Sequence, residues 1–209
     1  MAKVKICGLA NCNDALNATN LGADFVGFHF IKESSRKVSE KLAFDVISKL
    51  PPFVTPVAVF CNEDEKALVS VIKKLNIKNV QFNGSETLEY CKTVKDSQNV
   101  KIFKFSKVNS NEDMLQVESY KDVVDYLVLD VAYKDGEQTK FNYDIVLKIQ
   151  GFKIPVFISG DIVAEDIKGF LDKTSPYGFE ANESVERLPK RKDYDKMSSF
   201  IKAAHGLRI

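Results

Sequence analysis

The chain has 209 residues, with 30 lysines and arginines against 29 aspartates and glutamates, a formal net charge of +1, and 44% hydrophobic residues. This composition is ordinary for a globular protein, and the length allows one large domain or two small ones. A near-neutral charge argues against a nucleic-acid partner, because such binding needs a basic surface. No apolar run approaches the roughly 20 residues of a membrane span, and the first residues lack a secretory hydrophobic region, so we expect a cytoplasmic protein that does not enter a membrane.

The cysteines do not form the pattern of a metal site. Cys7, Cys12, Cys61 and Cys91 contain no Cys-x-x-Cys pair, and the only two histidines lie far apart in the sequence. We therefore expect no metal and no disulfide, with the cysteines serving as small buried side chains.

Short β-branched or aromatic runs alternate with longer segments of helical period along the whole chain. The predicted strands are 4–7, 24–28, 57–60, 77–82, 100–105, 126–130, 154–159 and 177–181. The predicted helices are 13–21, 40–50, 63–75, 86–95, 112–120, 143–150, 164–171 and 193–205. Gly22 is expected to close the first helix, Ser39 to cap the second, and Pro51-Pro52 to end the second.

Eight strand–helix units of roughly 25 residues each, with no long insertion or linker, predict one domain over residues 1–209. Near-continuous apolar strands such as 126–129 suit a parallel sheet that is covered on both faces. An open doubly wound sheet would alternate in the same way, but it usually has fewer strands, and no Gly-x-Gly-x-x-Gly follows the first strand. The pattern favours an α/β fold of the closed (β/α)8 type, the TIM barrel.

In such barrels the active site lies at the C-terminal ends of the strands. Cys7 and Asp130 occupy such positions and suit proton transfer, because a thiolate can act as a base and a carboxylic acid in an apolar mouth can act as an acid. Asp130 would alternatively cap a helix or lie in a loop. Arg36, in the second loop after a strand, is either a solvated charge or a bidentate partner for a substrate carboxylate.

A cysteine hydrolase is a competing interpretation of Cys7. Such an enzyme needs a base beside the thiol, usually histidine, and a third residue that orients the base. His29 follows the second predicted strand, so a contact with Cys7 is geometrically feasible. The sequence around Cys7 does not resemble that of a cysteine protease, which disfavours this interpretation.

Several motifs follow one another in the order of a known family. They are Lys5-Ile6-Cys7-Gly8, Asp14-Ala15, Leu21-Gly22-Ala23-Asp24, Ser35-Arg36-Lys37-Val38-Ser39, Val59-Phe60-Cys61-Asn62-Glu63, Val80-Gln81-Phe82-Asn83-Gly84 and Leu127-Val128-Leu129-Asp130. Together they resemble the phosphoribosylanthranilate isomerase family over essentially the whole chain. The resemblance implies a (β/α)8 barrel that performs an Amadori rearrangement of a small phosphosugar in tryptophan biosynthesis, with neither metal nor cofactor.

The resemblance also implies roles for individual residues. Asp130 would be the general acid that opens the ribose ring, and Cys7 the general base that removes the C2 proton. Arg36 would bind the anthranilate carboxylate, and Gln81 would contact the substrate. The phosphate would be bound by the loops after the last two strands, at Gly160, Asp161, Asn182, Glu183 and Ser184.

Three loops depart from the family pattern. The segment 135–143 replaces a glycine-rich loop, and Asp161 replaces the second glycine of a Gly-Gly pair. In the third loop, Asn182-Glu183-Ser184-Val185-Glu186 replaces Ser-Ser-Gly-Val-Glu. Asp161 and Glu183 would bring two carboxylates near a phosphate dianion, which is unfavourable unless backbone N–H groups do the binding. The alternative is a diverged barrel with another phosphosugar substrate or a non-catalytic binding role, but the retained acid–base pair favours the enzyme. No feature of the sequence sets the oligomeric state.

Overall fold

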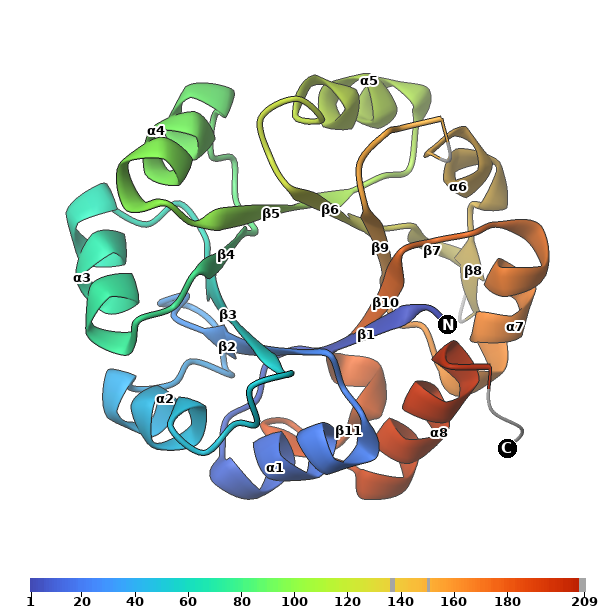
Figure 1. Ribbon diagram of the computed structural model, residues 1–209. Helices are drawn as coiled ribbons and strands as arrows, with labels where there is room; N and C mark the ends of the chain where they lie inside the picture. Colours follow the sequence, from blue (N-terminus) through green and yellow to red (C-terminus); the bar gives the residue numbers. More distant parts are fainter. Residues whose placement is uncertain (136–137, 150, 207–209) are drawn as a thin grey trace.

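The computed structural model describes residues 1–135, 138–149 and 151–206, and it confirms the predicted barrel (Figure 1). The barrel strands are β1 (Lys3–Ile6), β2 (Phe25–His29), β3 (Thr55–Phe60), β4 (Asn79–Phe82), β5 (Lys101–Lys107), β6 (Tyr126–Asp130), β9 (Val156–Ser159) and β10 (Gly178–Ala181). They are parallel and adjoin in the order β1, β10, β9, β6, β5, β4, β3, β2, with β2 closing the ring on β1. A closed ring has no unpaired edge strand.

Helices surround the ring of strands and cover its outer face (Figure 1). They are α1 (Cys12–Leu21), α2 (Glu40–Ile47), α3 (Glu65–Leu75), α4 (Leu88–Gln98), α5 (Asn111–Ser119), α6 (Tyr143–Ile149), α7 (Ala164–Lys173) and α8 (Tyr194–Ala204). None of the helices in the described part of the chain has the length and apolar character needed to cross a membrane.

Capping residues set the helix ends much as predicted. Gly22 ends α1 with a left-handed φ of 105°, and Ser39 accepts the N–H of Leu42 at 3.2 Å at the start of α2. The predicted end of α2 at residue 50 is wrong. The N–H groups of Lys49 and Leu50 bond to carbonyls three residues back, so a tighter turn ends the helix before the proline pair is reached.

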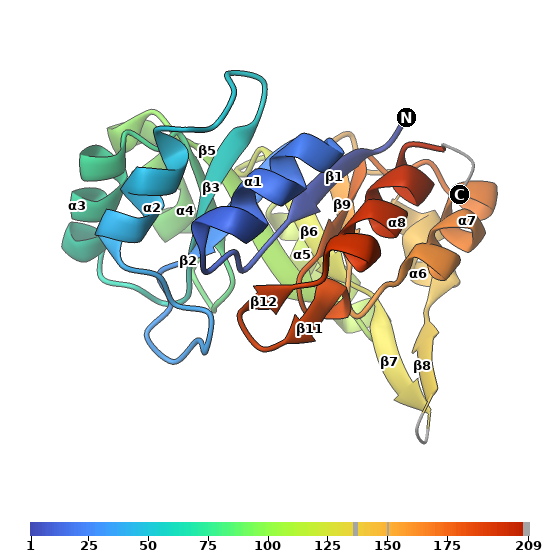
Figure 2. The ribbon, with the colours of Figure 1, turned by 90° about the horizontal axis from the view of Figure 1, so that it is seen from below.

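The expectation of short loops without insertions is wrong after β6. There β7 (Ala132–Asp135) and β8 (Gln138–Phe141) form an antiparallel hairpin, which extends beyond the end of the barrel in Figure 2. The loop residues Gly136 and Glu137, expected to replace glycines of the family, lie outside the described residues. Backbone pairing within the hairpin satisfies N–H and C=O groups that an irregular loop would leave to water.

A second short hairpin lies near the chain end. β11 (Glu186–Leu188) pairs with β12 (Arg191–Lys192), directly after a single turn of 3-10 helix over Glu183–Val185. Figure 2 shows it at the same end of the barrel as the β7–β8 hairpin. Both hairpins therefore border the end where the barrel strands terminate.

The interior of the barrel is filled in layers. An apolar layer, separate from the core between helices and sheet, consists of Phe25, Val57, Phe103, Val128 and Phe157. The ring of Phe25 meets those of Phe103 and Phe157 edge-on, with centroids 5.7 and 5.4 Å apart. Closer to the C-terminal ends of the strands, the buried interior side chains are polar: Lys5, Gln81 and Glu180. The side chains inside the barrel are thus apolar at its base and polar towards its mouth.

Candidate active site

A cavity of about 310 Å³ opens at the C-terminal ends of the strands. It is lined by His29, Asn83, Phe105, Lys107, Asp130, Ala132, Tyr133, Ser159, Gly160, Asp161, Glu180, Asn182 and Glu183. The volume lies at the lower end of the range for small-molecule sites. The predicted acid and most of the predicted phosphate-binding residues lie on this wall.

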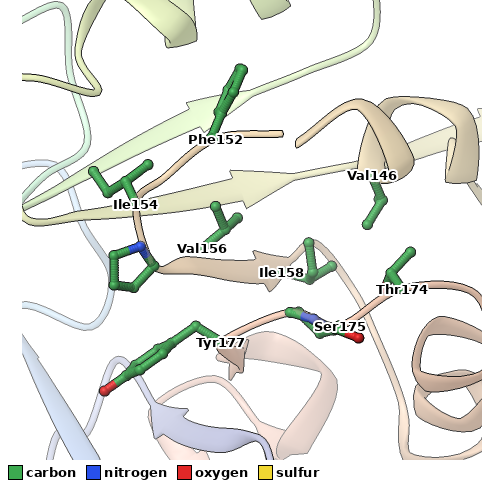
Figure 3. Close-up of a pocket in the computed structure, with 10 residues that line it drawn as sticks. Val146, Phe152, Ile154, Val156, Ile158, Thr174, Ser175 and Tyr177 are labelled. Carbon is green, nitrogen blue, oxygen red and sulfur yellow. The ribbon is translucent and has the colours of Figure 1, made fainter. Parts of the chain in front are cut away.

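A larger cavity of about 440 Å³ lies outside the ring of strands, against β9. Figure 3 shows Val156 and Ile158 of β9 along this cavity, with Val146 of α6 across from them and Tyr177 near the start of β10. Its lining in the described part of the chain is mainly apolar and offers no carboxylate, amine, thiol or imidazole. Among the described residues, this lining therefore lacks the carboxyl and imidazole groups that the cavity at the mouth presents.

Cys7 directly follows β1, and its thiol is buried among polar side chains. Lys5 lies two residues earlier on the same face of the strand, with its Nζ 3.4 Å from Cys7 Sγ. His29 Nε2 lies 3.4 Å from the same sulfur. Burial raises the pKa of the Cys7 thiol, and the Lys5 ammonium acts against this effect. Gly27 makes room for the thiol, since a Cβ there would lie 2.6 Å from Sγ.

Lys5 is completely buried, and its ammonium group has a full set of partners. It is ion-paired with Glu180 and donates a hydrogen bond to Gln81 Oε1 at 2.8 Å. Burial acts to lower the pKa of Lys5, but the charges of Cys7 and Glu180 outweigh this effect and raise it. The parallel register places Lys5 directly opposite Glu180. Lys5 is not among the site residues predicted from the sequence, although its two-residue spacing from Cys7 on a strand places both side chains on one face.

Gln81 lies beneath the cavity. Its side chain is fully buried, and its Nε2 donates to Asn83 Oδ1 at 3.0 Å, while its Oε1 accepts from Lys5. Through these two hydrogen bonds, Gln81 orients the side chains of Lys5 and Asn83. A direct contact between Gln81 and substrate stays a prediction.

Asp130 ends β6 and faces the cavity. Burial raises the pKa of its carboxyl group, and the N–H of Ala132, which donates to Oδ1 at 3.0 Å, acts to lower it. The charge of Lys107 also lowers the pKa, while those of Asp161 and Glu180 raise it. The net result is a raised pKa, which favours the protonated form that a general acid needs.

The turn after β9 places Gly160 and Asp161 in left-handed conformations, with φ values of 105° and 49°. A Cβ on Gly160 would lie 2.0 Å from Asp130 Oδ1, so only glycine leaves space for the acid. Asp161 stands where the resemblance has glycine. Aspartate tolerates the left-handed region better than most residues, which lets the turn keep its shape.

The turn after β10 contains the remaining phosphate-binding candidates. The backbone and side-chain oxygens of Asn182 accept hydrogen bonds from Lys192 Nζ at 2.7 and 3.1 Å. Glu183 reaches the cavity, and its carboxylate lies 3.0 Å from Arg36 Nη1. Ser184 borders a separate depression beside α7 and α8, so the structure does not place it on the cavity wall.

Arg36 is engaged within the protein. Its Nε and Nη2 donate to the two carboxylate oxygens of Glu186 at 2.8 and 2.7 Å, and Lys192 Nζ lies 3.1 Å from Glu186 Oε1. The hydrogen bonding of the Arg36 guanidinium to the Glu186 carboxylate is the main reason that the pKa of Arg36 is raised. The third edge of the guanidinium, at Nη1, faces the exposed carboxylate of Glu183. A substrate carboxylate would therefore compete with Glu183 and leave the Glu186 pair in place.

Lys107 is a cation on the cavity wall that the sequence analysis missed. It ends β5 and lies opposite Asp130 in the β5–β6 register. No ion pair engages its ammonium group in the described part of the chain. The lysines of β5 recur every third residue, at 101, 104 and 107, and this spacing does not show which of them reaches the mouth.

Fold and site together define a (β/α)8 barrel with a carboxyl group on the wall of its mouth cavity and a buried thiol next to His29, which lines that cavity. Residues 4–203 match the model of a family described as N-(5'-phosphoribosyl)anthranilate (PRA) isomerase. The chain belongs to this family.

Individual relatives match along their whole length. The N-(5'-phosphoribosyl)anthranilate isomerase of Thermotoga maritima is 31% identical over 99% of this chain and 100% of its own. That of Pelobacter propionicus is 32% identical over 100% of this chain and 98% of its own. A crystal structure of phosphoribosyl anthranilate isomerase in complex with reduced 1-(o-carboxyphenylamino)-1-deoxyribulose 5-phosphate has a TM-score of 0.89 and 31% identity, covering 99% of this chain and 100% of its own.

Proposed function

We propose that this chain is a cytoplasmic enzyme of tryptophan biosynthesis. It converts N-(5'-phosphoribosyl)anthranilate to 1-(2-carboxyphenylamino)-1-deoxyribulose 5-phosphate by an Amadori rearrangement. The carrying observation is the cavity at the barrel mouth, where the raised pKa of Asp130 suits it to act as the acid. Burial raises the pKa of Cys7, the base, and the ammonium group of Lys5 opposes this effect and favours the thiolate. The full-length family match supports the same reaction. The reaction is an aldose–ketose isomerisation, an intramolecular oxidation and reduction that consumes no external electrons.

Asp130 acts first, as the general acid. Its carboxyl group donates a proton to the ribose ring oxygen, the C1–O bond breaks, and the nitrogen lone pair forms the C=N bond of a protonated Schiff base. The carboxylate left behind accepts the N–H of Ala132 and lies in the field of Lys107, both of which favour the charged form.

Cys7 acts second, as the general base. Its thiolate removes the C2 proton, and the electrons of the C–H bond form a C1=C2 double bond while the Schiff base nitrogen becomes neutral. The resulting enolamine gains a proton at C1 and loses one from the C2 hydroxyl group, which yields the ketone. Lys5 favours the thiolate that this step requires. β10 and β9 separate β1 from β6 in the ring, so base and acid come from different parts of the barrel wall.

The two anionic ends of the substrate bind at separate places. Backbone N–H groups at the turns of Gly160 and Asn182 hold the phosphate, and Arg36 Nη1 holds the anthranilate carboxylate after displacing Glu183. Lys107 offsets the negative charge that the cavity carries.

A second candidate function is a barrel with a different phosphosugar substrate or a binding role alone. The observations that favour it are the carboxylates of Asp161 and Glu183 on the cavity wall and the engagement of Arg36 by Glu186. The acid–base pair has no purpose in a pure binding protein, which favours the isomerase.

The test is a direct turnover assay with N-(5'-phosphoribosyl)anthranilate generated in situ. Wild-type protein should turn over, whereas Cys7→Ser and Asp130→Asn should lose activity with unchanged circular dichroism. Cys91→Ser is the matched control, because Cys91 is a buried thiol in α4 that does not line the cavity. Well-folded wild-type protein without turnover would contradict the isomerase function and favour the second candidate.

A further inference from the structure

His29 has no part in the acid–base steps above, yet it lies between Cys7 and the cavity. It lines the cavity wall, its residue is 6% exposed, and its Nε2 is 3.4 Å from Cys7 Sγ. We propose that His29 is a positioning residue that donates a hydrogen bond from Nε2–H to the Cys7 thiolate and is held in that tautomer by Ser34. This inference rests on the proposed role of Cys7 as the base.

Ser34 sets the direction of this chain of hydrogen bonds. Its Oγ accepts the backbone N–H of Arg36 at 3.1 Å and lies 3.0 Å from His29 Nδ1. A serine hydroxyl group has one proton to donate, and His29 Nδ1 is the acceptor that the described residues offer it. When Ser34 donates to Nδ1, the ring proton lies on Nε2 and points at the sulfur of Cys7.

The imidazole ring is neutral at physiological pH. Burial, followed by the positive charges of Lys5, Lys192 and Arg36, lowers the pKa of His29 to about 3. A ring with this pKa does not take the proton of a thiol, so His29 is not the activating base of a cysteine hydrolase. What a neutral ring offers is a hydrogen-bond donor, and a donor to the charged form of a group favours that form.

Charged groups from several elements also face the Cys7 thiol or the ring of His29 beside it. They are Lys5 of β1, Arg36 of the loop after β2, Glu180 of β10, Glu186 of β11 and Lys192 of β12. Each cation among them is ion-paired with one of the two carboxylates. Their net effect on the thiol is therefore smaller than three positive charges would suggest. The N–H of His29 favours the thiolate without adding a charge to be compensated.

The experiment measures the ionisation of Cys7 directly. The protein is labelled with 13C at the cysteine Cβ atoms, its NMR spectrum is recorded against pH, and Cys7→Ser assigns the signal. His29→Val removes both ring nitrogens and suits a strand, whereas His29→Gln retains an N–H donor near the place of Nε2. His205→Gln, at the end of α8, changes the only other histidine of the chain and is the control.

We expect the pKa of Cys7 to rise in His29→Val, with a fall of about tenfold in the thiolate fraction at neutral pH. His29→Gln and His205→Gln should stay near wild type. Ser34→Ala keeps the imidazole ring but frees its tautomer, so it should also raise the pKa of Cys7. This variant keeps the test available if His29→Val does not fold.

Turnover provides a second measurement. The active form combines a Cys7 thiolate with a protonated Asp130, so a higher pKa of Cys7 moves the alkaline limb of the kcat profile to higher pH and lowers its maximum about tenfold. A loss of kcat without this movement would mean a merely structural role and would overturn the inference.

Two titration results would also overturn it. An unchanged pKa of Cys7 in both His29→Val and Ser34→Ala means that no hydrogen bond favours the thiolate. A lower pKa means that the thiol donates to the ring, the reverse direction. The titration does not depend on turnover, so an inactive wild-type protein with the expected titration would contradict the proposed function and still support the hydrogen bond.

Discussion

Glu186 holds Arg36 through two parallel hydrogen bonds, from Nε and Nη2, across 150 residues of sequence. The side chains are 13% and 7% exposed, so the pair is shielded from water. It joins the loop after β2 to the hairpin that follows the last barrel strand. Glu186 thus orients the guanidinium, and the edge at Nη1 is left for an exchangeable partner.

Glu186→Gln should destabilise the protein, because Arg36 and Lys192 then lose the anion they share. Removing one partner of a buried ion pair costs about 3–5 kcal/mol, and we expect a loss of about 3 kcal/mol in the free energy of unfolding measured in urea. Arg36→Ala should also raise KM, and its effect on stability should not add to that of Glu186→Gln in the double variant. An unchanged KM would remove Arg36 from substrate binding.

Asp130→Asn should lower kcat by about a hundredfold or more, the scale expected for a general acid. The stability of Asp130→Asn relative to wild type should instead increase with pH. The pKa of Asp130 is raised on folding, so the folded state binds its proton more tightly than the unfolded state, and this contribution is lost as pH rises through the folded pKa. Asp130→Asn should therefore become more stable relative to wild type between pH 4 and pH 8. Thermal unfolding of both proteins across this range, at equal ionic strength, measures the difference in their stability. A difference that does not change with pH would mean that the carboxyl group of Asp130 is solvated in the folded state.

Gly160→Ala should damage the acid through direct contact. The added Cβ would lie 2.0 Å from Asp130 Oδ1, so the carboxyl group must move, and we expect a loss of kcat together with a lower melting temperature. Gly206→Ala is the control, since Gly206 also has a positive φ, of 69°, but open space around its Cβ position. Gly206→Ala should lower the free energy of unfolding by only about 1–2 kcal/mol, which is the cost of a left-handed backbone for a residue with a side chain. Equal effects of the two substitutions on kcat would contradict the contact.

The low pKa of His29 predicts a loss of stability in mild acid. The unfolded chain binds a proton at His29 below about pH 6.5, whereas the folded chain resists it until about pH 3, so stability from this group falls as pH decreases between these values. The expected loss between pH 6.5 and pH 5 is about 2 kcal/mol. Urea unfolding of wild type and His29→Gln at both pH values isolates the contribution, because all other groups titrate in both proteins. An equal loss of stability in the two proteins would mean that the pKa of His29 is not lowered by folding.

Lys107→Met should weaken substrate binding and alter the acid. Loss of the cation should raise KM several-fold at low salt and less at high salt. Lys107 lowers the pKa of Asp130, so its removal should move the acid limb of the activity profile to higher pH. Lys101→Met changes an exposed lysine at the other end of β5 and should alter neither quantity.

The sequence was sufficient for the barrel and for part of the site. Strand residues such as 126–129 are apolar on both faces, a local property that survives in the fold, and Gly22 and Ser39 act through their nearest neighbours. Cys7 and Asp130 were predicted because the barrel rule assigns function to strand ends, whereas the phosphate-binding turn at Gly160 was predicted from the family resemblance.

The positions of the remaining site residues depend on contacts between segments far apart in the chain, which the local sequence does not reveal. Lys5 looks like the solvated side of an alternating strand, but closure of the barrel turns that side inward and Glu180 compensates its charge. The partner of Arg36 lies at the far end of the chain, and the hairpin after β6 replaced an expected loop. Each of these features follows from register or from long-range pairing, which local pattern does not determine.

The aromatic layer of Phe25, Phe103 and Phe157 has a consequence for the movement of protons. It fills the barrel on the side of Lys5 away from the mouth, so no polar side chain of this layer leads from Cys7 towards the opposite end. Substrate, product and protons therefore share one entrance. While substrate occupies that entrance, we expect the thiol to exchange protons with the substrate and its own hydrogen-bonded neighbours, sheltered from bulk water.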